Sequence, residues 1–435
     1  MHPREALFIL FASAALPVSG ALAGVTISTG VAAQRSETVL YSFKNGNDGS
    51  LPFAGLIADG KGNFYGTTQT GGGSGCGGQG CGTVFRLAAD GTETILYSFR
   101  GGTDGAKPQA GLIADNAGNL YGTTGAGGGS RDAGTVFELA SDGMETILYT
   151  FCSLENCVDG GGPEGGLVMD SSRNLFGATA YGGILGHGGK WCSHGCGVVF
   201  RLAPDGVETV LHAFKGRDDG AAPEGSLIMA GSGDLYGTTP EGGMQSRSCR
   251  EIFPARCDTV FKIAPDGKER VLYRFCSQPN CADGAAPELG TLVMDRQGNL
   301  YGTAAYGGAR GHGVVFRLAP NGEETVLHDF QGAPDGLAPL GGLVGDGKGN
   351  FYGTTLQGGS GTGCAGEIGC GTVFKVARDG AETILYSFQH GGDGSFPYGG
   401  VMLDGAGSLF GTTGYGGGTN CSGGYGCGTV FEIGN

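Results

Sequence analysis

The stretch Gly55–Phe99 decides the fold, and it reads GLIADGKGNFYGTTQTGGGSGCGGQGCGTVFRLAADGTETILYSF. It contains four short segments rich in β-branched and aromatic residues, at 55–59, 64–68, 83–87 and 93–99. Glycine-rich turns separate these segments, and the Asp-Gly dipeptide before the last one is typical of a β-hairpin. The stretch therefore predicts four consecutive antiparallel strands.

The same unit recurs along the whole chain. Its most regular part is an aromatic-Gly-[Thr/Ala]-[Thr/Ala] segment that returns every 51 to 65 residues, at Tyr65, Tyr121, Phe176, Tyr236, Tyr301, Tyr352 and Phe410. No window shows a sustained helical period, so helices should be nearly absent. Seven repeats of this kind predict an all-β fold, a seven-bladed β-propeller with four antiparallel strands per blade.

The two ends of the repeat array predict how the ring closes. A fourth-strand sequence, Glu37–Phe43, stands alone before the first complete unit, and the seventh unit stops after its third strand, Val430–Ile433. Pairing these two segments would complete the last blade and leave no open edge between the first and last blades. We therefore expect the propeller to span 37–435, with its last blade closed by the N-terminal strand.

The first 33 residues are expected to be a signal peptide and a short leader. Arg4 precedes an apolar stretch, and small residues follow in an A-x-A-like pattern. This pattern is typical of a secretory signal peptide, which is too short to anchor in a membrane. Cleavage after Ala23 and cleavage after Ala33 both fit it. The mature chain is expected to be secreted, periplasmic or at the cell surface, with no membrane span.

The charge balance narrows the classes of partner. The chain carries 26 basic and 41 acidic side chains, for a formal net charge of −15. A nucleic-acid-binding protein needs a basic face, and the sequence contains no Lys/Arg cluster to supply one. We therefore expect no nucleic-acid partner. Two further expectations are that the protein is a monomer and that it works without a cofactor.

The 14 cysteines fall into near-neighbour pairs with none left over. An even number of cysteines in an exported protein predicts disulfides, here local staples within single loops. Zinc is the alternative, but the pairs lack a consistent Cys-x-x-Cys spacing. The expected disulfides are Cys76–Cys81, Cys152–Cys157, Cys192–Cys196, Cys249–Cys257, Cys276–Cys281, Cys364–Cys370 and Cys421–Cys427.

The repeat also carries a family resemblance. Its units, Gly-Leu-x-x-Asp-x-x-Gly-Asn-Leu-Tyr-Gly-Thr-Thr, then Gly-Thr-Val-Phe-x-Leu and Asp-Gly-x-Glu-Thr-x-Leu-x-x-Phe, resemble the GloVer tandem-repeat family of exported bacterial proteins over Glu37–Ile433. The resemblance implies no established activity. A looser similarity to NHL-type propellers, through Asp-x-x-Gly-Asn-Leu-Tyr, implies that the first strand lines the axial channel and the fourth strand is outermost.

One face of such a propeller is the place to look for function. The connections from fourth to first strands and from second to third strands emerge there, and variable loops on a rigid scaffold usually carry binding. The connection entering every blade contains Asp-Gly-x-x-Pro. A ring of seven aspartates could bind calcium, but a single carboxylate per repeat better fits an aspartate that hydrogen-bonds its own turn.

The residue after this proline varies around the ring, as expected for positions that contact a ligand at the channel mouth. The seven residues are Phe53, Gln109, Glu164, Glu224, Glu288, Leu340 and Tyr398. Glu164, Glu224 and Glu288 come from three adjacent blades and could coordinate a cation or accept hydrogen bonds from sugar hydroxyls. The alternative is that they are solvated charges on an acidic protein.

Aromatic residues in the second-to-third loops are the other binding candidates. Tyr181, Tyr306 and Tyr415 directly precede a Gly-Gly pair, and the single tryptophan, Trp191, lies in the loop of the third blade. Such rings can form platforms for sugars or peptides. Alternatively, each ring packs over its own glycine-rich loop.

An enzyme remains the alternative to a binding protein. His187 and His312 lie in loops of the same face and could form an acid–base pair with the three glutamates, as in a hydrolase or lyase. However, the chain contains no nucleophile elbow, P-loop or metalloprotease motif. The sequence therefore favours an exported scaffold that binds a glycan, peptide or protein at its axial face, and a purely structural or assembly role is the third alternative.

Overall fold

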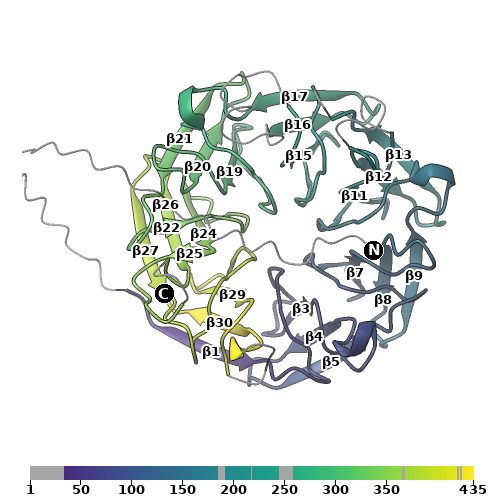
Figure 1. Cartoon of the computed structure of the whole chain (residues 1–435), viewed down its shortest axis with the longest axis horizontal. Coiled ribbons are helices and arrows are strands. Elements are labelled where there is room, and N and C mark those ends of the chain that lie inside the picture. Colours follow the sequence, from purple (N-terminus) through teal and green to yellow (C-terminus); the bar gives the residue numbers. More distant parts are fainter. Residues whose placement is uncertain are drawn as a thin grey trace, which may run out of the picture. The chain divides into compact units, whose positions relative to one another are not determined.

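Each repeat unit forms one four-stranded antiparallel sheet, and seven such sheets follow one another around a central axis (Figure 1). The computed structural model describes residues 34–184, 192–216, 218–243, 258–364, 368–418, 421 and 424–435. The first blade contains β2 (Ile57–Ala58), β3 (Phe64–Thr68), β4 (Thr83–Leu87) and β5 (Glu93–Ser98), paired in that order. The fourth strands lie at the outer rim, as the resemblance to NHL-type propellers implied.

The next five blades repeat this order. Their strands are β6 (Ile113–Ala114), β7 (Leu120–Thr124), β8 (Thr135–Leu139), β9 (Glu145–Thr150), β10 (Val168–Met169), β11 (Leu175–Thr179), β12 (Val198–Leu202), β13 (Glu208–Ala213), β14 (Ile228–Met229), β15 (Leu235–Thr239), β16 (Thr259–Ile263), β17 (Glu269–Arg274), β18 (Val293–Met294), β19 (Leu300–Ala304), β20 (Val314–Leu318), β21 (Glu324–Asp329), β23 (Val344–Gly345), β24 (Asn350–Thr355), β26 (Thr372–Ala377) and β27 (Glu382–Ser387).

Little other regular structure occurs in the described part of the chain. A two-stranded ladder joins β22 (Gly336–Leu337) to β25 (Gln357–Gly358) beside the sixth blade. The helical elements there are three-residue 3-10 turns, η1 (Cys76–Gly78), η2 (Glu155–Cys157) and η4 (Pro279–Cys281). The expectation that helices are nearly absent is confirmed.

The last blade closes the ring as the repeat pattern predicted. It contains β28 (Met402–Leu403), β29 (Leu409–Thr413) and β30 (Thr429–Ile433), and its outer strand is β1 (Glu37–Ser42). β1 and β30 pair antiparallel from Glu37 opposite Ile433 to Ser42 opposite Thr429. The first strand of the described chain thus supplies the strand that the seventh repeat lacks.

Neighbouring blades meet through one repeated aromatic contact. The phenylalanine that ends each fourth strand packs edge-on against the third-strand phenylalanine of the next blade, with ring centroids 5.0–5.2 Å apart. All these rings are buried. The pairs are Phe43–Phe85, Phe99–Phe137, Phe151–Phe200, Phe214–Phe261, Phe275–Phe316, Phe330–Phe374 and Phe388–Phe431.

The glycine of the aromatic-Gly motif is required by this contact. In each second strand the glycine lies directly under the third-strand phenylalanine, so that a Cβ atom on Gly122 would lie 2.7 Å from Cζ of Phe137. The same position in the other blades gives 2.6–2.8 Å. Because cores are close-packed, no side chain fits beneath the ring without displacing it.

We expect Gly122→Ala to lower the free energy of unfolding by about 1–3 kcal/mol, because the added methyl group must displace Phe137 or Leu112. Urea unfolding followed by circular dichroism measures the change. Gly405→Ala is the control, since Gly405 is exposed and a Cβ there would meet nothing within 4 Å. Equal stability of the two variants would contradict the close-packing argument.

Candidate functional site

A cavity of about 360 Å³ lies on the propeller axis, and all seven blades contribute to its wall. The wall is formed by residues that follow the Asp-Gly-x-x-Pro segment and by the first strands themselves. The lining residues include Phe53, Leu56, Gln109, Glu164, Glu224, Ser226, Leu289, Thr291, Leu343, Tyr398 and Val401. The expectation that the first strands line the channel is therefore confirmed.

The cavity opens on the face that carries the long loops. In six blades an isolated β-bridge joins the fourth-to-first connection to the second-to-third loop, for example between Ser50 and Thr70 and between Ser395 and Tyr415. In the sixth blade the β22–β25 ladder makes the same link. These two sets of loops therefore lie side by side, and the residue after each proline lies at the axial end of one of them.

Small residues and threonine hydroxyls hold the wall together. The residue two after the proline is Ala or Gly in six blades, because neighbouring first strands nearly touch: a Cβ on Gly399 would lie 2.7 Å from the backbone of Ala54. Second-strand threonines donate to the carbonyl of this residue in the next blade. The bonds run from Thr67 to Ala110, Thr123 to Gly165, Thr303 to Gly341, Thr354 to Gly399 and Thr412 to Ala54, at 2.8–3.2 Å.

One side of the mouth is aromatic. Phe53 of the first blade and Tyr398 of the seventh lie with ring centroids 4.4 Å apart. Both rings cover Gly414, where a Cβ would come within 2.8 Å of Phe53 and 3.0 Å of Tyr398. Burial raises the pKa of the Tyr398 hydroxyl, so the phenol is neutral at physiological pH. The pair offers a fixed apolar surface with one hydroxyl at its edge.

The opposite side is acidic. Glu164 and Glu224, of the third and fourth blades, are half-buried and line the cavity, as the sequence predicted for the mouth. No Lys, Arg or His occurs among the described lining residues. A ligand in this cavity would therefore meet carboxylates on one side and an aromatic pair on the other.

Glu288 does not join this acidic wall, although the sequence grouped it with Glu164 and Glu224. The fifth blade has one residue more than the others between its proline, Pro287, and its first-strand leucine, Leu292. The extra residue brings Leu289 to the wall. Among the described residues, the buried hydroxyl of Thr238 also has no hydrogen-bond partner, because the expected acceptor is displaced.

The loop tyrosines lie on the same face but do not line the cavity. Tyr181, Tyr306 and Tyr415 each form the β-bridge to the connection that enters their blade. The ring of Tyr181 lies over Gly161 and Gly162, so closely that a Cβ at either glycine would overlap it. The ring of Tyr181 therefore packs over the connection that enters its blade, and not over its own glycine-rich loop as the packing alternative had it.

The histidine candidates are not assembled with the glutamates. His187 and Trp191 lie outside the described residues. The ring of His312 lies against Gly332 in the neighbouring connection and does not reach the lining of the axial cavity. Among the described residues, therefore, the structure does not form the Glu/His pair that the enzyme alternative requires.

The seven Asp-Gly-x-x-Pro aspartates are engaged in their own turns. Each accepts a backbone N–H from the turn and a hydrogen bond from a Tyr or His of the preceding fourth strand. The side-chain donors and acceptors are Tyr41 to Asp48, Tyr97 to Asp104, Tyr149 to Asp159, His212 to Asp219, Tyr273 to Asp283, His328 to Asp335 and Tyr386 to Asp393, at 2.5–3.3 Å. These hydrogen bonds fit the interpretation in which each aspartate stabilises its own turn, and they do not fit a ring of calcium sites.

One group in the described part of the chain has the composition of a metal site. His328, Asp335 and Glu382 place one ligand atom each within 4.8 Å of one another. Equivalent positions recur in every blade, with Tyr in place of His in five of them. We therefore interpret the group as part of the repeat and assign no metal to it.

Disulfides brace the loops around the mouth. Six of the seven expected pairs are formed, namely Cys76–Cys81, Cys152–Cys157, Cys192–Cys196, Cys276–Cys281, Cys364–Cys370 and Cys421–Cys427. The pair Cys249–Cys257 lies outside the described residues. No free cysteine occurs among the residues that are described.

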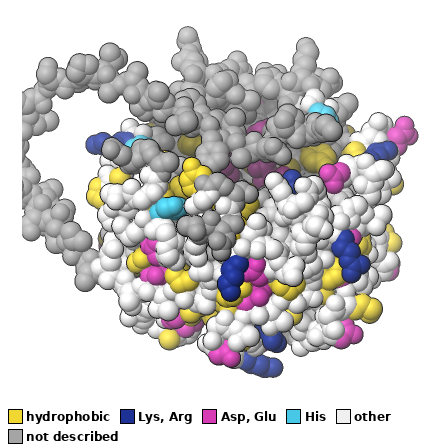
Figure 2. Space-filling model, turned by 60° about the horizontal axis from the view of Figure 1, so that its bottom comes forward, with side chains coloured by type: hydrophobic (Ala, Val, Ile, Leu, Met, Phe, Trp, Pro, Cys, Tyr) yellow, Lys and Arg dark blue, Asp and Glu magenta, His cyan; other side chains and the backbone are white. Residues whose placement is uncertain are grey.

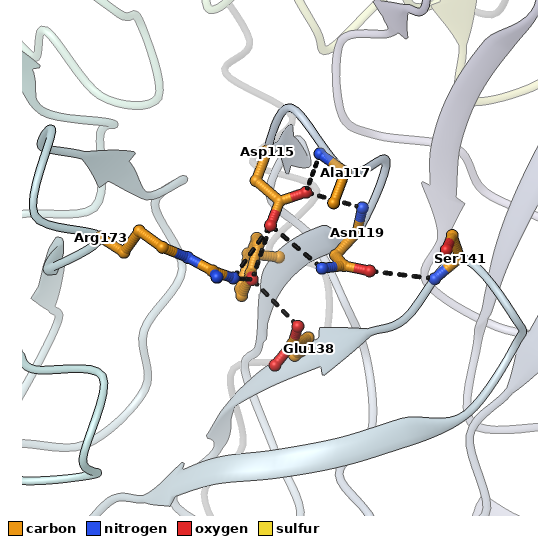
Figure 3. Close-up of polar contacts among 7 residues, drawn as sticks. Asp115, Ala117, Asn119, Glu138, Ser141 and Arg173 are labelled. Carbon is orange, nitrogen blue, oxygen red and sulfur yellow. Dashed lines mark hydrogen bonds and ion pairs between the residues drawn. The ribbon is translucent and has the colours of Figure 1, made fainter.

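The opposite face is built from repeated turns whose polar groups bond to one another. Asp115 accepts backbone N–H groups of Ala117 and Asn119 at 2.9 and 3.0 Å, and Arg173 of the next blade donates to it at 2.9 Å (Figure 3). Asp59, Asp170, Asp295 and Asp346 form similar turns. On the face in Figure 2, Lys and Arg side chains are scattered singly among acidic and neutral ones, which agrees with the absence of a basic surface in the sequence.

A matched pair of threonines tests the hydrogen bonds of the cavity wall. We expect Thr303→Val to cost about 0.5–1.5 kcal/mol of unfolding free energy, because it removes a buried hydrogen bond to Gly341. Thr238→Val should be neutral or stabilising, because that buried hydroxyl has no partner to lose. Chemical unfolding of both variants decides the point, and an equal loss in both would contradict it.

Several solved structures align with this chain, one of them with a TM-score above 0.5. The extracellular domain of a candidate one-component system of B. thetaiotaomicron aligns with a TM-score of 0.51 at 11% identity, over 92% of this chain and 42% of that one. A candidate 6-phosphogluconolactonase of Bacteroides uniformis aligns with a TM-score of 0.44 at 16% identity, over 76% of this chain and 83% of that one. A Dyadobacter fermentans protein of unknown function gives 0.44 at 12% identity, over 92% and 98%.

The sequence itself identifies the family. No curated protein matches the chain significantly. The family model for the Gloeobacter/Verrucomicrobia repeat matches residues 18–249, 189–360 and 249–435, which together span nearly the whole chain. The chain therefore belongs to the Gloeobacter/Verrucomicrobia repeat family.

Proposed function

We propose that this protein is an exported binding propeller and that its axial cavity binds a neutral sugar unit. The observation that carries the proposal is the placement of an aromatic pair, Phe53 and Tyr398, across the axis from two carboxylates, Glu164 and Glu224. Sugars present an apolar C–H face and a rim of hydroxyls, which suit an aromatic surface and carboxylate acceptors respectively.

Size and charge favour this class of ligand over others. A cavity of about 360 Å³ is at the lower end of the range of roughly 300–1,000 Å³ for small-molecule sites, which suits a single ring-shaped unit. The described lining offers no cationic side chain to an anionic ligand. A phosphorylated or carboxylated substrate would therefore meet two carboxylates and no cationic side chain of the described lining.

The exported location is part of the same proposal. Six disulfides are consistent with an oxidising compartment. No helix in the described residues is both long enough and apolar enough to cross a membrane. A glycan at a cell surface or in the periplasm is a ligand available to such a protein.

Catalysis has weaker support than binding. The acid–base alternative needs a histidine beside Glu164 or Glu224, and His312 lies elsewhere. Without that pair, the described cavity has acceptors and an apolar surface but no assembled proton-transfer system. We therefore keep binding as the conclusion.

Titration calorimetry with a panel of neutral monosaccharides and their short oligosaccharides tests the proposal. We expect Tyr398→Leu and Glu224→Gln each to weaken binding of the best ligand by about fivefold or more, because aromatic stacking and a charged hydrogen bond each contribute about 1 kcal/mol or more. Because each contact contributes only this much, we expect the wild-type protein to bind the sugar with a Kd between millimolar and micromolar.

Two exposed residues of the same types provide controls. Tyr425→Leu and Glu155→Gln change an exposed tyrosine and an exposed glutamate on loops away from the cavity lining, and both should leave affinity within about twofold. If no sugar in the panel binds, or if controls and cavity variants lose affinity equally, the axial sugar site is wrong. Selective capture of one protein partner would then favour the assembly alternative.

A further inference from the structure

Every fourth strand begins with a glutamate, and these seven residues form a second repeated cluster far from the axial cavity. They are Glu37, Glu93, Glu145, Glu208, Glu269, Glu324 and Glu382. Each lies at a blade seam, meaning the contact between the fourth strands of two neighbouring blades. There its charge interacts with that of the aspartate in the Asp-Gly-x-x-Pro connection that enters its own blade. In the sixth blade, carboxylate oxygens of Glu382 and Asp335 lie within 4.8 Å of one another.

Each glutamate has an unusual environment. In all seven, the oxygen Oε1 is buried and has no hydrogen-bond partner among the described residues. Leaving a buried carboxylate oxygen without a donor is costly, and a second carboxylate facing it raises the cost further. Because the arrangement recurs at all seven seams, it is a property of the repeat and not an accident of one side chain.

The partner aspartate already has its donors. Asp48, for example, accepts hydrogen bonds from the Tyr41 hydroxyl and the Lys44 backbone, both at 2.9 Å. The facing glutamate has one buried oxygen, Oε1, without a hydrogen-bond partner among the described residues, so a proton taken up there would give that oxygen a hydrogen bond to make. A protonated carboxyl can itself donate a hydrogen bond, which an ionised one cannot.

We propose that each blade seam holds one proton shared by a Glu/Asp pair, and that these protons make the closed ring more stable in mildly acidic than in alkaline solution. A single proton converts two facing carboxylates from mutual repulsion to a donor and an acceptor. Because one such pair lies at each of the seven seams, loss of these protons weakens every contact between neighbouring blades at once.

The direction of the pKa shifts agrees with this arrangement. Burial, and then the charge of the facing aspartate, raises the pKa of six glutamates to about 7, namely Glu37, Glu93, Glu145, Glu208, Glu324 and Glu382. Burial also raises the pKa of Glu269, where His212, Arg274 and Lys215 oppose the shift.

The other charged and titratable groups at the seams determine which pairs depend most on pH. Besides the aspartates, the glutamates face Tyr41 and Lys44, Tyr97 and Arg100, Tyr149, His212, Lys215 and Arg274, Tyr273, His328, and Tyr386. A protonated histidine can neutralise part of the charge at the two seams that contain one. The five seams with tyrosine should therefore carry most of the effect.

The sign of the pH dependence follows from linkage. A carboxyl whose pKa is 4.5 when unfolded and about 7 when folded takes up a proton on folding throughout the interval between these values. Its contribution to stability is complete below pH 4.5 and is lost as the pH rises through 7. The unfolding constant should increase with pH in this interval, by at most about tenfold per pH unit for each seam.

The test is urea unfolding of the full chain at pH 5.5, 7.0 and 8.5, with EDTA present throughout. We expect the wild-type protein to be most stable at pH 5.5 and least stable at pH 8.5. The triple variant Glu93→Gln, Glu208→Gln, Glu324→Gln changes three tyrosine seams to a neutral donor that does not titrate in this interval. It should lose about three-fifths of the pH dependence, because five tyrosine seams carry most of it, and it should gain stability relative to the wild type at pH 8.5.

Glu323→Gln is the matched control, because Glu323 is exposed and directly precedes Glu324 in the sequence. It should keep the full wild-type pH dependence. A wild-type protein whose stability is constant or rises from pH 5.5 to 8.5, or a triple variant with unchanged pH dependence, would overturn the proposal. So would a pH dependence that appears only when a divalent cation replaces EDTA.

Carboxyl-carbon NMR titration of the wild-type protein gives an answer even if the triple variant fails to fold. The proposal requires a set of glutamate resonances that titrate near pH 7, apart from those of the exposed glutamates. Titration of every glutamate below pH 5 would overturn it.

Discussion

The edge-on contact between two phenylalanines of neighbouring blades is the constraint on which the rest of the structure depends. The contact joins the end of one blade to the centre of the next, and it recurs seven times with nearly the same geometry. It explains why the neighbouring strand carries glycine, since Phe137 leaves no room for a Cβ at Gly122. It also explains the closure, because Phe43, directly after β1, makes the same contact with Phe85 and so joins the last blade to the first.

This geometry separates the repeated parts of the molecule from the variable ones. At the rim, outer strands of neighbouring blades must fit one another, and the same aromatic, aspartate and glutamate residues return in nearly every blade. At the axis the seven blades converge so closely that only small residues fit between their backbones. Threonine hydroxyls form hydrogen bonds between neighbouring blades there. The residue after each proline is subject neither to the fit between outer strands nor to the close approach of the backbones at the axis. Its side chain can therefore vary from blade to blade, and it can contact a ligand.

The fold could be predicted from the sequence because the repeat itself specifies it. The sequence contains seven units of four strands, with one fourth strand moved to the start of the array. A closed propeller satisfies this pattern, and β1 pairs with β30 as it requires. The site could be predicted only in part. Glu164 and Glu224 line the cavity, whereas one additional residue in the fifth blade brings Leu289 to the wall in place of Glu288, and the binding role predicted for these residues stays a prediction. The pairing of Phe53 with Tyr398 depends on ring closure, so their separation in sequence gave no local signal. The seam glutamates did have a signal, since every fourth strand begins with one, but their burial opposite an aspartate became visible only in three dimensions.

The central claim is that the variable residues at the axial mouth, rather than the repeated loops around them, contact the ligand. A crystal structure of the protein grown with a neutral monosaccharide at a concentration near saturation tests this most directly. The account predicts density for one sugar ring in the axial cavity, with its apolar face on Phe53 and Tyr398 and its hydroxyls within hydrogen-bond distance of Glu164 or Glu224. Density on the outer loops or the opposite face, with the axial cavity containing only water, would contradict it.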